Sequence, residues 1–86
     1  MEYTPGMVVK SLAGHDAGSF YVVAAAQDGF CYIADGRLRS LASPKKKNPR
    51  HLQATGSWID LSQVDTDRKL KEALRPLNSK TEKGGN

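Results

Sequence analysis

The segment that most constrains this chain is 7–27, in which two short apolar runs flank a polar loop that contains two glycines. The runs, Met7–Val9 and Phe20–Ala26, are rich in valine, a β-branched residue that suits the half-buried surface of a strand. Glycine allows the backbone to reverse between them. The segment therefore predicts strands over residues 7–11 and 20–27, joined by a loop over residues 12–19, as in a small barrel.

Two Asp-Gly pairs follow, at positions 28–29 and 35–36. Such pairs are typical of two-residue hairpins, because a type I′ turn needs positive φ at both central residues. They enclose a short apolar run over residues 30–34. We therefore expect a three-strand meander that continues into a fourth strand over residues 37–41.

The fourth predicted strand carries Arg37 and Arg39, which alternation places on one face. We expect the next residues, 42–50, to form a basic loop, because its two prolines disfavour a helix. A last strand over residues 51–55 would follow. Trp58 and the apolar residues after it are then expected to pack back over the barrel.

Beyond residue 63 the pattern changes to that of a helix. Asp65 or Thr66 can cap its start, and Pro76 should end or kink it. Leucines and an alanine recur at helical spacing, at positions 70, 73, 74 and 77. We expect a barrel over residues 1–63, a helix packed on it over residues 64–77, and a disordered polar tail over residues 78–86. The predicted fold is all-β, a small barrel of about five strands with one C-terminal helix.

Length and composition limit the class of protein. A chain of 86 residues forms one domain with little room for a deep substrate cleft. Cys31 is the only cysteine, so no internal disulfide can form, and its place in an apolar run predicts a small buried hydrophobe. The N-terminal residues carry no secretion signal, and no apolar run is long enough to span a bilayer. We therefore expect a cytoplasmic monomer that does not act at membranes.

No pattern in the chain predicts catalysis. The loop over residues 12–19 lacks the spacing of a phosphate-binding loop, and no pair of carboxylates lies in an apolar setting. His15 and His51 are too few for a metal site without cysteine pairs. We therefore expect no enzymatic activity, no metal and no cofactor.

The charge is concentrated in one segment. The chain has 13 basic and nine acidic residues, a formal charge of +4. Residues 37–50 contain six bases and no acid: Arg37, Arg39, Lys45, Lys46, Lys47 and Arg50. Such a segment matches the phosphate backbone of a nucleic acid, although a lysine run can also be a solvated surface only.

The order of residues from Gly6 to Gln53 resembles a known family. The glycines, valines and lysine of GMVVKSLAGHDAGS, followed by an aromatic residue and two valines, resemble the KOW motif of ribosomal proteins and transcription elongation factors. The later runs DGRLR, PKKKN and HLQ extend the resemblance to the small bacterial KOW-domain RNA-binding proteins, which are similar to ribosomal proteins L14e/L6e/L27e.

This resemblance implies an SH3-like barrel that binds RNA, most of all ribosomal RNA. The first loop would contribute through Lys10, His15 and Ser19. The full set of expected RNA-contacting residues is Lys10, His15, Arg37, Arg39, Lys45, Lys46, Lys47, Asn48, Arg50 and His51. Two alternatives stay open at this point. One of the tyrosines, Tyr21 or Tyr32, could be a platform on which a base stacks. The domain could also be a protein-interaction module that binds ribosomal or transcription proteins.

Overall fold

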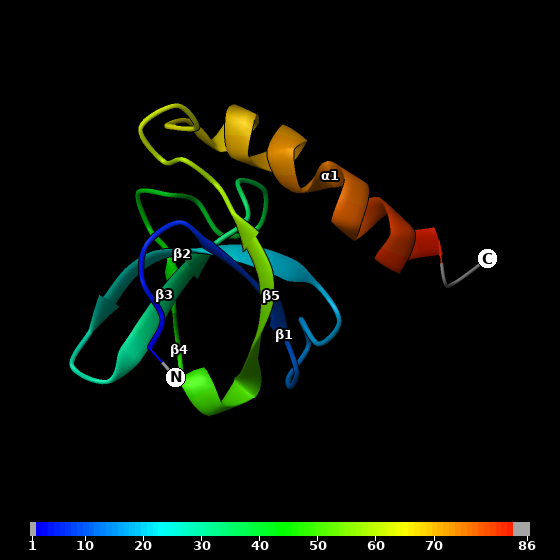
Figure 1. The fold of residues 1–86 in the computed structure, drawn as a ribbon. Helices are drawn as coiled ribbons and strands as arrows, with labels where there is room; N and C mark the ends of the chain where they lie inside the picture. Colours follow the sequence, from blue (N-terminus) through cyan, green and yellow to red (C-terminus); the bar gives the residue numbers. More distant parts are fainter. Residues whose placement is uncertain (1, 84–86) are drawn as a thin grey trace.

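The structure is a computed structural model that describes residues 2–83, with side chains described from residue 2 to residue 79. Five antiparallel strands form one sheet in the order β4-β3-β2-β1-β5, which curls into a small SH3-like barrel with one helix beside it (Figure 1). The elements are β1 (Met7–Ser11), β2 (Phe20–Gln27), β3 (Phe30–Ala34), β4 (Lys45–Lys47), the short 3-10 helix η1 (Pro49–His51), β5 (Leu52–Trp58) and α1 (Asp67–Lys83). Because η1 leads directly from β4 to β5, it joins the two edge strands of the sheet.

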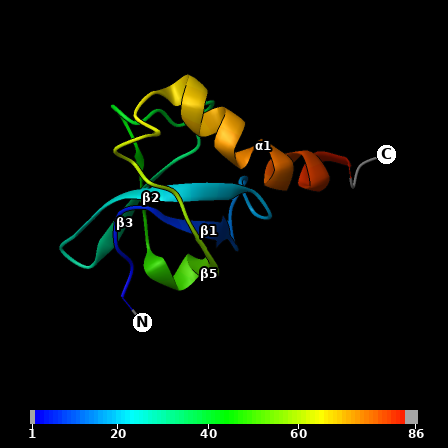
Figure 2. The same cartoon turned by 45° about the horizontal axis from the view of Figure 1, so that its top comes forward.

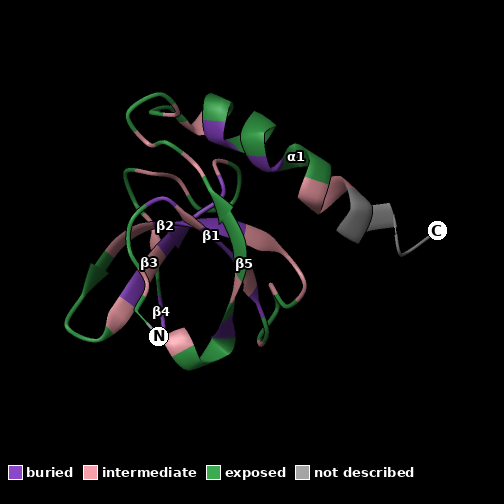
Figure 3. Cartoon of the chain, in the orientation of Figure 1, coloured by how far each residue is buried: buried purple, intermediate pink, exposed green. Residues whose placement is uncertain are grey.

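Many residues of the central strands are buried (Figure 3), and their apolar side chains belong to two cores, one on each face of the sheet. The inner face forms the barrel core, built from Val9, Tyr21, Val23, Cys31, Ile33 and Leu52. The outer face forms a second core under α1, built from Val8, Val22, Ala34, Leu70 and Leu74. Strand β2 is therefore apolar on both of its alternating faces, because one faces the barrel interior and the other faces the helix.

The first three strands were predicted correctly, and so was the turn between β2 and β3. Asp28 and Gly29 both have positive φ, of 53° and 81°, as a type I′ turn requires. Cys31 is buried, as expected, and burial raises the pKa of its thiol.

The predicted strand over residues 37–41 is wrong. Of the pair at 35–36, only Gly36 has positive φ, so the second type I′ turn does not form. The Asp35 carboxylate instead accepts the backbone N–H groups of Arg37 and Arg39, both at 2.9 Å, and the Arg39 carbonyl accepts the N–H groups of residues 35 and 36. These hydrogen bonds close a compact turn over residues 35–39. The backbone N–H groups of residues 35, 36, 37 and 39 are therefore not available to pair with a neighbouring strand.

The strand that pairs with β3 lies within the segment expected to be a basic loop. Strand β4 is the lysine run itself, with Lys45, Lys46 and Lys47 opposite Ile33, Tyr32 and Cys31. The last strand, expected over residues 51–55, runs from Leu52 to Trp58. Trp58 does not pack back over the barrel, because 62% of its surface is exposed.

Helix α1 begins near the predicted residue but extends past the predicted end. Thr66 caps its start, accepting the backbone N–H of Lys69 at 3.2 Å. The helix continues through Pro76 to Lys83, so residues 78–83 are helical where a disordered tail was expected, and 84–86 lie outside the described residues. Contacts beyond the proline explain this. Leu77 packs against the outer core, and the Asn78 amide group pairs with both backbone groups of Phe20.

Helix α1 lies over the outer face of the sheet and is attached near both ends of its described part (Figure 2). At its start, the Asp67 carboxylate accepts the N–H of Leu41 at 2.7 Å. Gly36 comes so close to this first turn that an added Cβ would lie 2.2 Å from the Asp67 carbonyl oxygen. Among residues 2–83, no helix has the length and apolar character that crossing a membrane requires.

Candidate nucleic-acid interface

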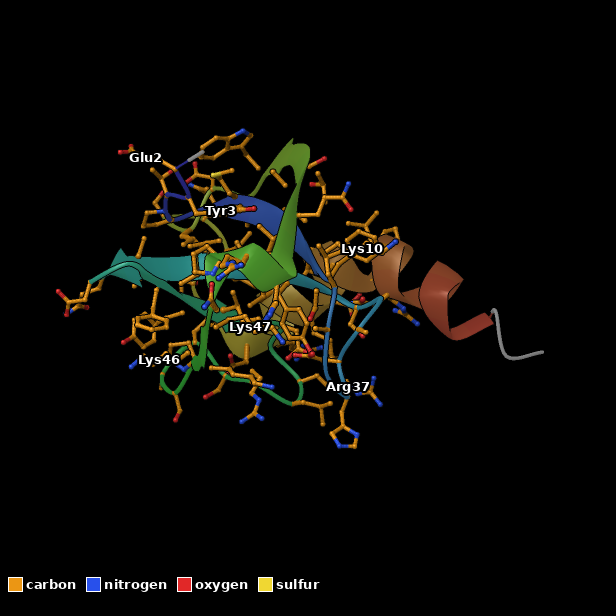
Figure 4. All side chains as sticks on the ribbon, turned by 90° about the horizontal axis from the view of Figure 1, so that it is seen from below. Glu2, Tyr3, Lys10, Arg37, Lys46 and Lys47 are labelled. Carbon is orange, nitrogen blue, oxygen red and sulfur yellow. The ribbon has the colours of Figure 1, made fainter. Side chains whose placement is uncertain are left out.

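The three lysines of β4 do not share a face. Because side chains alternate along a strand, Lys45 and Lys47 point to the same side as Cys31 and Ile33 of the barrel core, and Lys46 points to the other side. Lys47 is buried, with 8% of its surface exposed. In Figure 4 its side chain lies within the barrel, whereas Lys46 lies at the periphery.

Asp16, in the first loop, forms ion pairs with both inward-pointing lysines, Lys45 and Lys47. Its carboxylate lies 3.1 Å from the Lys47 ammonium group and 3.4 Å from that of Lys45, and it accepts the Ser11 hydroxyl at 2.9 Å. The Lys47 ammonium group also donates to the Ala13 carbonyl at 3.0 Å. This cluster closes one end of the barrel and ties the loop over residues 12–19 to β4.

The cluster has clear electrostatic consequences. Burial acts to raise the pKa of Asp16, but the hydrogen bonds from Lys47 and Ser11 and the charges of both lysines outweigh it, so the pKa is lowered. Burial, followed by the charges of Asp16 and Asp35, raises the pKa of Tyr21 to about 12. Tyr21 is therefore neutral, and it is also buried, so it cannot serve as a base-stacking platform.

Two of the expected contact residues lie against aromatic rings. The Lys46 ammonium group lies 4.3 Å from the centroid of the Phe30 ring, a cation–π contact on the outer side of β4. The Lys10 ammonium group lies 5.9 Å from the centroid of the Phe20 ring. Figure 4 shows Lys46 and Lys10 on opposite sides of the barrel, so these two lysines do not form one patch.

The remaining candidates lie on turns. Arg37 and Arg39 are exposed on the turn over residues 35–39. Arg50 and His51 are exposed on η1, while Asn48 has a structural role, since its side chain caps η1 by accepting the Arg50 N–H at 2.9 Å. The first loop, with exposed His15 near its tip, is joined to η1 through the Leu12 N–H and the His51 carbonyl, 2.8 Å apart.

The structure therefore divides the predicted site residues into two groups. Lys47, Lys45 and Asn48 support the barrel end. The exposed basic set consists of Arg37, Arg39, Lys46 and Arg50. His15 and His51 are exposed beside it, and Lys10 is half-buried.

Sequence reasoning missed two basic residues that the fold brings beside this set. Lys71 and Arg75 of α1 line a groove of about 440 Å³ whose opposite wall contains Arg37. They are four residues apart and so lie on one helix face, which was a detectable signal. What the sequence did not show was which turn this face would meet.

No protein-family model and no curated protein matches the chain. Within residues 2–83, no group of three or more His, Cys, Asp or Glu side chains is placed to hold a metal ion.

Proposed function

We propose that this chain binds RNA through the exposed basic set, Arg37, Arg39, Lys46 and Arg50. The observation that carries the proposal is the inward orientation of two acids, Asp16 and Asp35. Asp16, the only acid of the first loop, is held by two lysines, and Asp35 is buried against the backbone of its own turn. Residues 36–51 contain no acid. Their exposed charge is therefore entirely positive, which favours a polyanion.

The mechanism is electrostatic attachment of a rigid barrel to the sugar-phosphate backbone. Arginine can donate two parallel hydrogen bonds to one phosphate, and lysine acts as a point charge. Such contacts supply affinity and strong salt dependence but carry little sequence information. The resemblance to KOW-domain proteins supports RNA over DNA, and ribosomal RNA among RNAs, with the protein acting as a cytoplasmic monomer.

The test is binding to purified ribosomal RNA, and co-sedimentation with ribosomal particles, over a range of salt concentrations. If all four residues contact phosphates, the log–log slope of affinity against salt is about −2.8 to −3.6. Lys46→Ala/Arg50→Ala should weaken binding and make this slope shallower. Arg68→Ala/Lys69→Ala is the control, because it removes the same charge from exposed positions of α1.

Equal behaviour of the two pairs would contradict the proposed surface, and absence of RNA binding by the wild-type protein would contradict the function. Replacing all three lysines of β4 would be a poor test, because removal of buried Lys47 also destabilises the barrel.

One observation favours a second candidate, a protein-interaction module. Trp58 is exposed beside Met7, its partner in β1, at the end of β5 remote from η1. Exposed tryptophans are frequent at the centre of protein interfaces. In that case, association with ribosomal particles should survive ribonuclease treatment and should be lost in Trp58→Ser.

A further inference from the structure

The groove between α1 and the turn over residues 35–39 has two basic walls. Arg37 and Leu38 line the turn wall, and Lys71, Glu72 and Arg75 line the helix wall. Ser19, Tyr21, Asn78 and Ser79 also line the groove. The volume of about 440 Å³ lies in the range of sites that hold a ligand of nucleotide size.

Two acids line this groove among the residues that the structure describes, and both have partners. Asp35 accepts two backbone N–H groups and is buried, and the Glu72 carboxylate lies 3.2 Å from the Arg75 guanidinium group. Among the described lining residues, three bases against two acids leave a formal charge of only +1. The preference for an anion therefore depends on where the bases lie, on facing walls, more than on their number.

The walls are held in place without a ligand. The close approach of Gly36 to the first turn of α1 and the hydrogen bond from the Leu41 N–H to Asp67 fix the helix against the turn. Two hydrogen bonds between the Asn78 amide group and the backbone of Phe20 fix a later part of the helix against β2. A groove that is already formed loses little conformational entropy when it binds. It can therefore act as a site even with few charges.

The chemistry of the lining fits a phosphodiester with its sugar. Arg37, Lys71 and Arg75 can donate to phosphate oxygens, and the hydroxyl groups of Ser19 and Ser79 can donate to phosphate or ribose. Leu38, which is 73% exposed at the rim, offers an apolar surface to a ribose or a base. Tyr21 is neutral and adds no negative charge to the groove.

We propose that this groove holds a phosphate-bearing segment of the bound RNA, so that α1 forms the second wall of the RNA site. This inference rests on the proposed function, and it extends the contact from the barrel to a helix that the sequence did not link to RNA.

The first test compares two charge-matched pairs of variants on α1. Lys71→Ala/Arg75→Ala removes the groove bases, and Arg68→Ala/Lys69→Ala removes two exposed bases that do not line the groove. Each pair also breaks one exposed ion pair, Arg75–Glu72 or Lys69–Asp65, both 3.2 Å long. Loss of two phosphate contacts should make the log–log salt slope for purified ribosomal RNA shallower by about 1.4 to 1.8 in the groove pair only. Equal slopes in the two pairs would overturn the proposal.

The second test predicts a gain. Glu72→Gln removes an acid from the groove and frees Arg75, so affinity for ribosomal RNA should rise about two- to fivefold at low salt, since a nearby like charge is removed. Asp65→Asn removes the acid from the equivalent ion pair with Lys69, away from the groove, and should have a smaller effect. No gain, or an equal gain in Asp65→Asn, would count against the groove.

The outcomes separate this inference from the function on which it rests. If Lys46→Ala/Arg50→Ala weakens RNA binding and the groove pair does not, the groove proposal fails and the function stands. If wild-type protein does not bind ribosomal RNA but binds polyglutamate through Lys71 and Arg75, the groove takes an acidic protein segment and both proposals fail. Circular dichroism of each variant should match the wild type, since the substituted residues are exposed.

Discussion

Lys47 is a charged residue at a position where a barrel core would usually take an apolar one. Its ammonium group has two partners, Asp16 and the carbonyl of Ala13. A buried charge is tolerated when it has suitable partners. Removing one member of a buried pair destabilises the protein, because the other charge then stays buried without its partner. Lys46, its neighbour in sequence, is exposed on the opposite side of β4. The two residues therefore provide a direct comparison of a structural and a surface lysine.

We predict that Lys47→Met destabilises the protein by about 3 kcal/mol, because it leaves the Asp16 carboxylate poorly exposed and without its closest cation. Lys46→Met should change the free energy of unfolding by less than about 0.5 kcal/mol. Urea denaturation measures both. Asp16→Asn/Lys47→Met should recover part of the loss, because both members of the buried pair are then neutral, and Lys45, the other partner of Asp16, is partly exposed. Similar losses in Lys46→Met and Lys47→Met would show that Lys47 is not held as described.

The same ion pair predicts a dependence on pH. The pKa of Asp16 is lower in the folded protein than in the unfolded chain. The stability that the carboxylate contributes is therefore present above the unfolded pKa and is lost as the pH falls through the folded pKa. The difference in unfolding free energy between wild type and Asp16→Asn should be largest near neutral pH and shrink in acid. A constant difference from pH 7 to pH 2 would contradict this prediction.

At the scale of elements, the helix and the turn over residues 35–39 depend on one close contact. Gly36 and Gly29 have nearly equal φ, 79° and 81°, so alanine is strained by a similar amount at either site. They differ in surroundings. An added Cβ at Gly36 would meet the Asp67 carbonyl oxygen at 2.2 Å, whereas nothing lies within 4 Å of one at Gly29.

We therefore predict that Gly29→Ala costs about 1 kcal/mol, the strain of positive φ alone, and that Gly36→Ala costs at least about 2 kcal/mol more, because the helix must move. Thermal unfolding followed by circular dichroism measures the difference. Equal losses would mean that the helix is not seated on this turn.

The sequence predicted most of the elements but not all of their limits. Strands β1, β2 and β3 were found because valine-rich runs and a true Asp-Gly turn are local signals. The prediction of a strand over residues 37–41 was wrong, because the Asp35 carboxylate accepts hydrogen bonds from the backbone N–H groups of Arg37 and Arg39. The predicted end of α1 at residue 77 was too early, because contacts of Leu77 and Asn78 with the barrel hold the chain beyond Pro76 in the helix. Such tertiary contacts are not visible in a local pattern.

At the scale of the whole molecule, the two cores share the central strands. Val22 of β2 contributes to the core under α1, while its neighbours Tyr21 and Val23 contribute to the barrel core. The helix and the barrel are therefore expected to lose their structure together.

We predict a single cooperative unfolding transition. The far-UV circular dichroism of the helix and the near-UV signal of barrel tyrosines such as Tyr21 should coincide in urea. Leu74→Ala, which removes a fully buried leucine of the outer core, should shift both curves together by about 2 to 4 kcal/mol. Earlier loss of the helix signal would show that α1 is only loosely attached.

For the candidate site, the sequence located the basic segment, but it could not show which of its residues are exposed and which have a structural role. Alternation along β4 decides that Lys46 faces solvent and Lys47 does not, and the segment was expected to be a loop. The contribution of Lys71 and Arg75 depends on how α1 crosses the turn, which is set by contacts far apart in the chain. The number of basic residues in the segment indicated an anionic partner. The fold determines which of these residues are exposed and able to contact it.

Trp58 is the one tryptophan of the chain, and it is exposed at the end of β5 that pairs with Met7. Its fluorescence in the folded state therefore comes from an indole already in contact with water, and unfolding should shift the emission maximum little. The same signal monitors the end of β5 opposite η1. A titration with RNA that leaves tryptophan emission unchanged would thus agree with binding at the exposed basic set, and a dye attached to the turn over residues 35–39 would be the more sensitive probe.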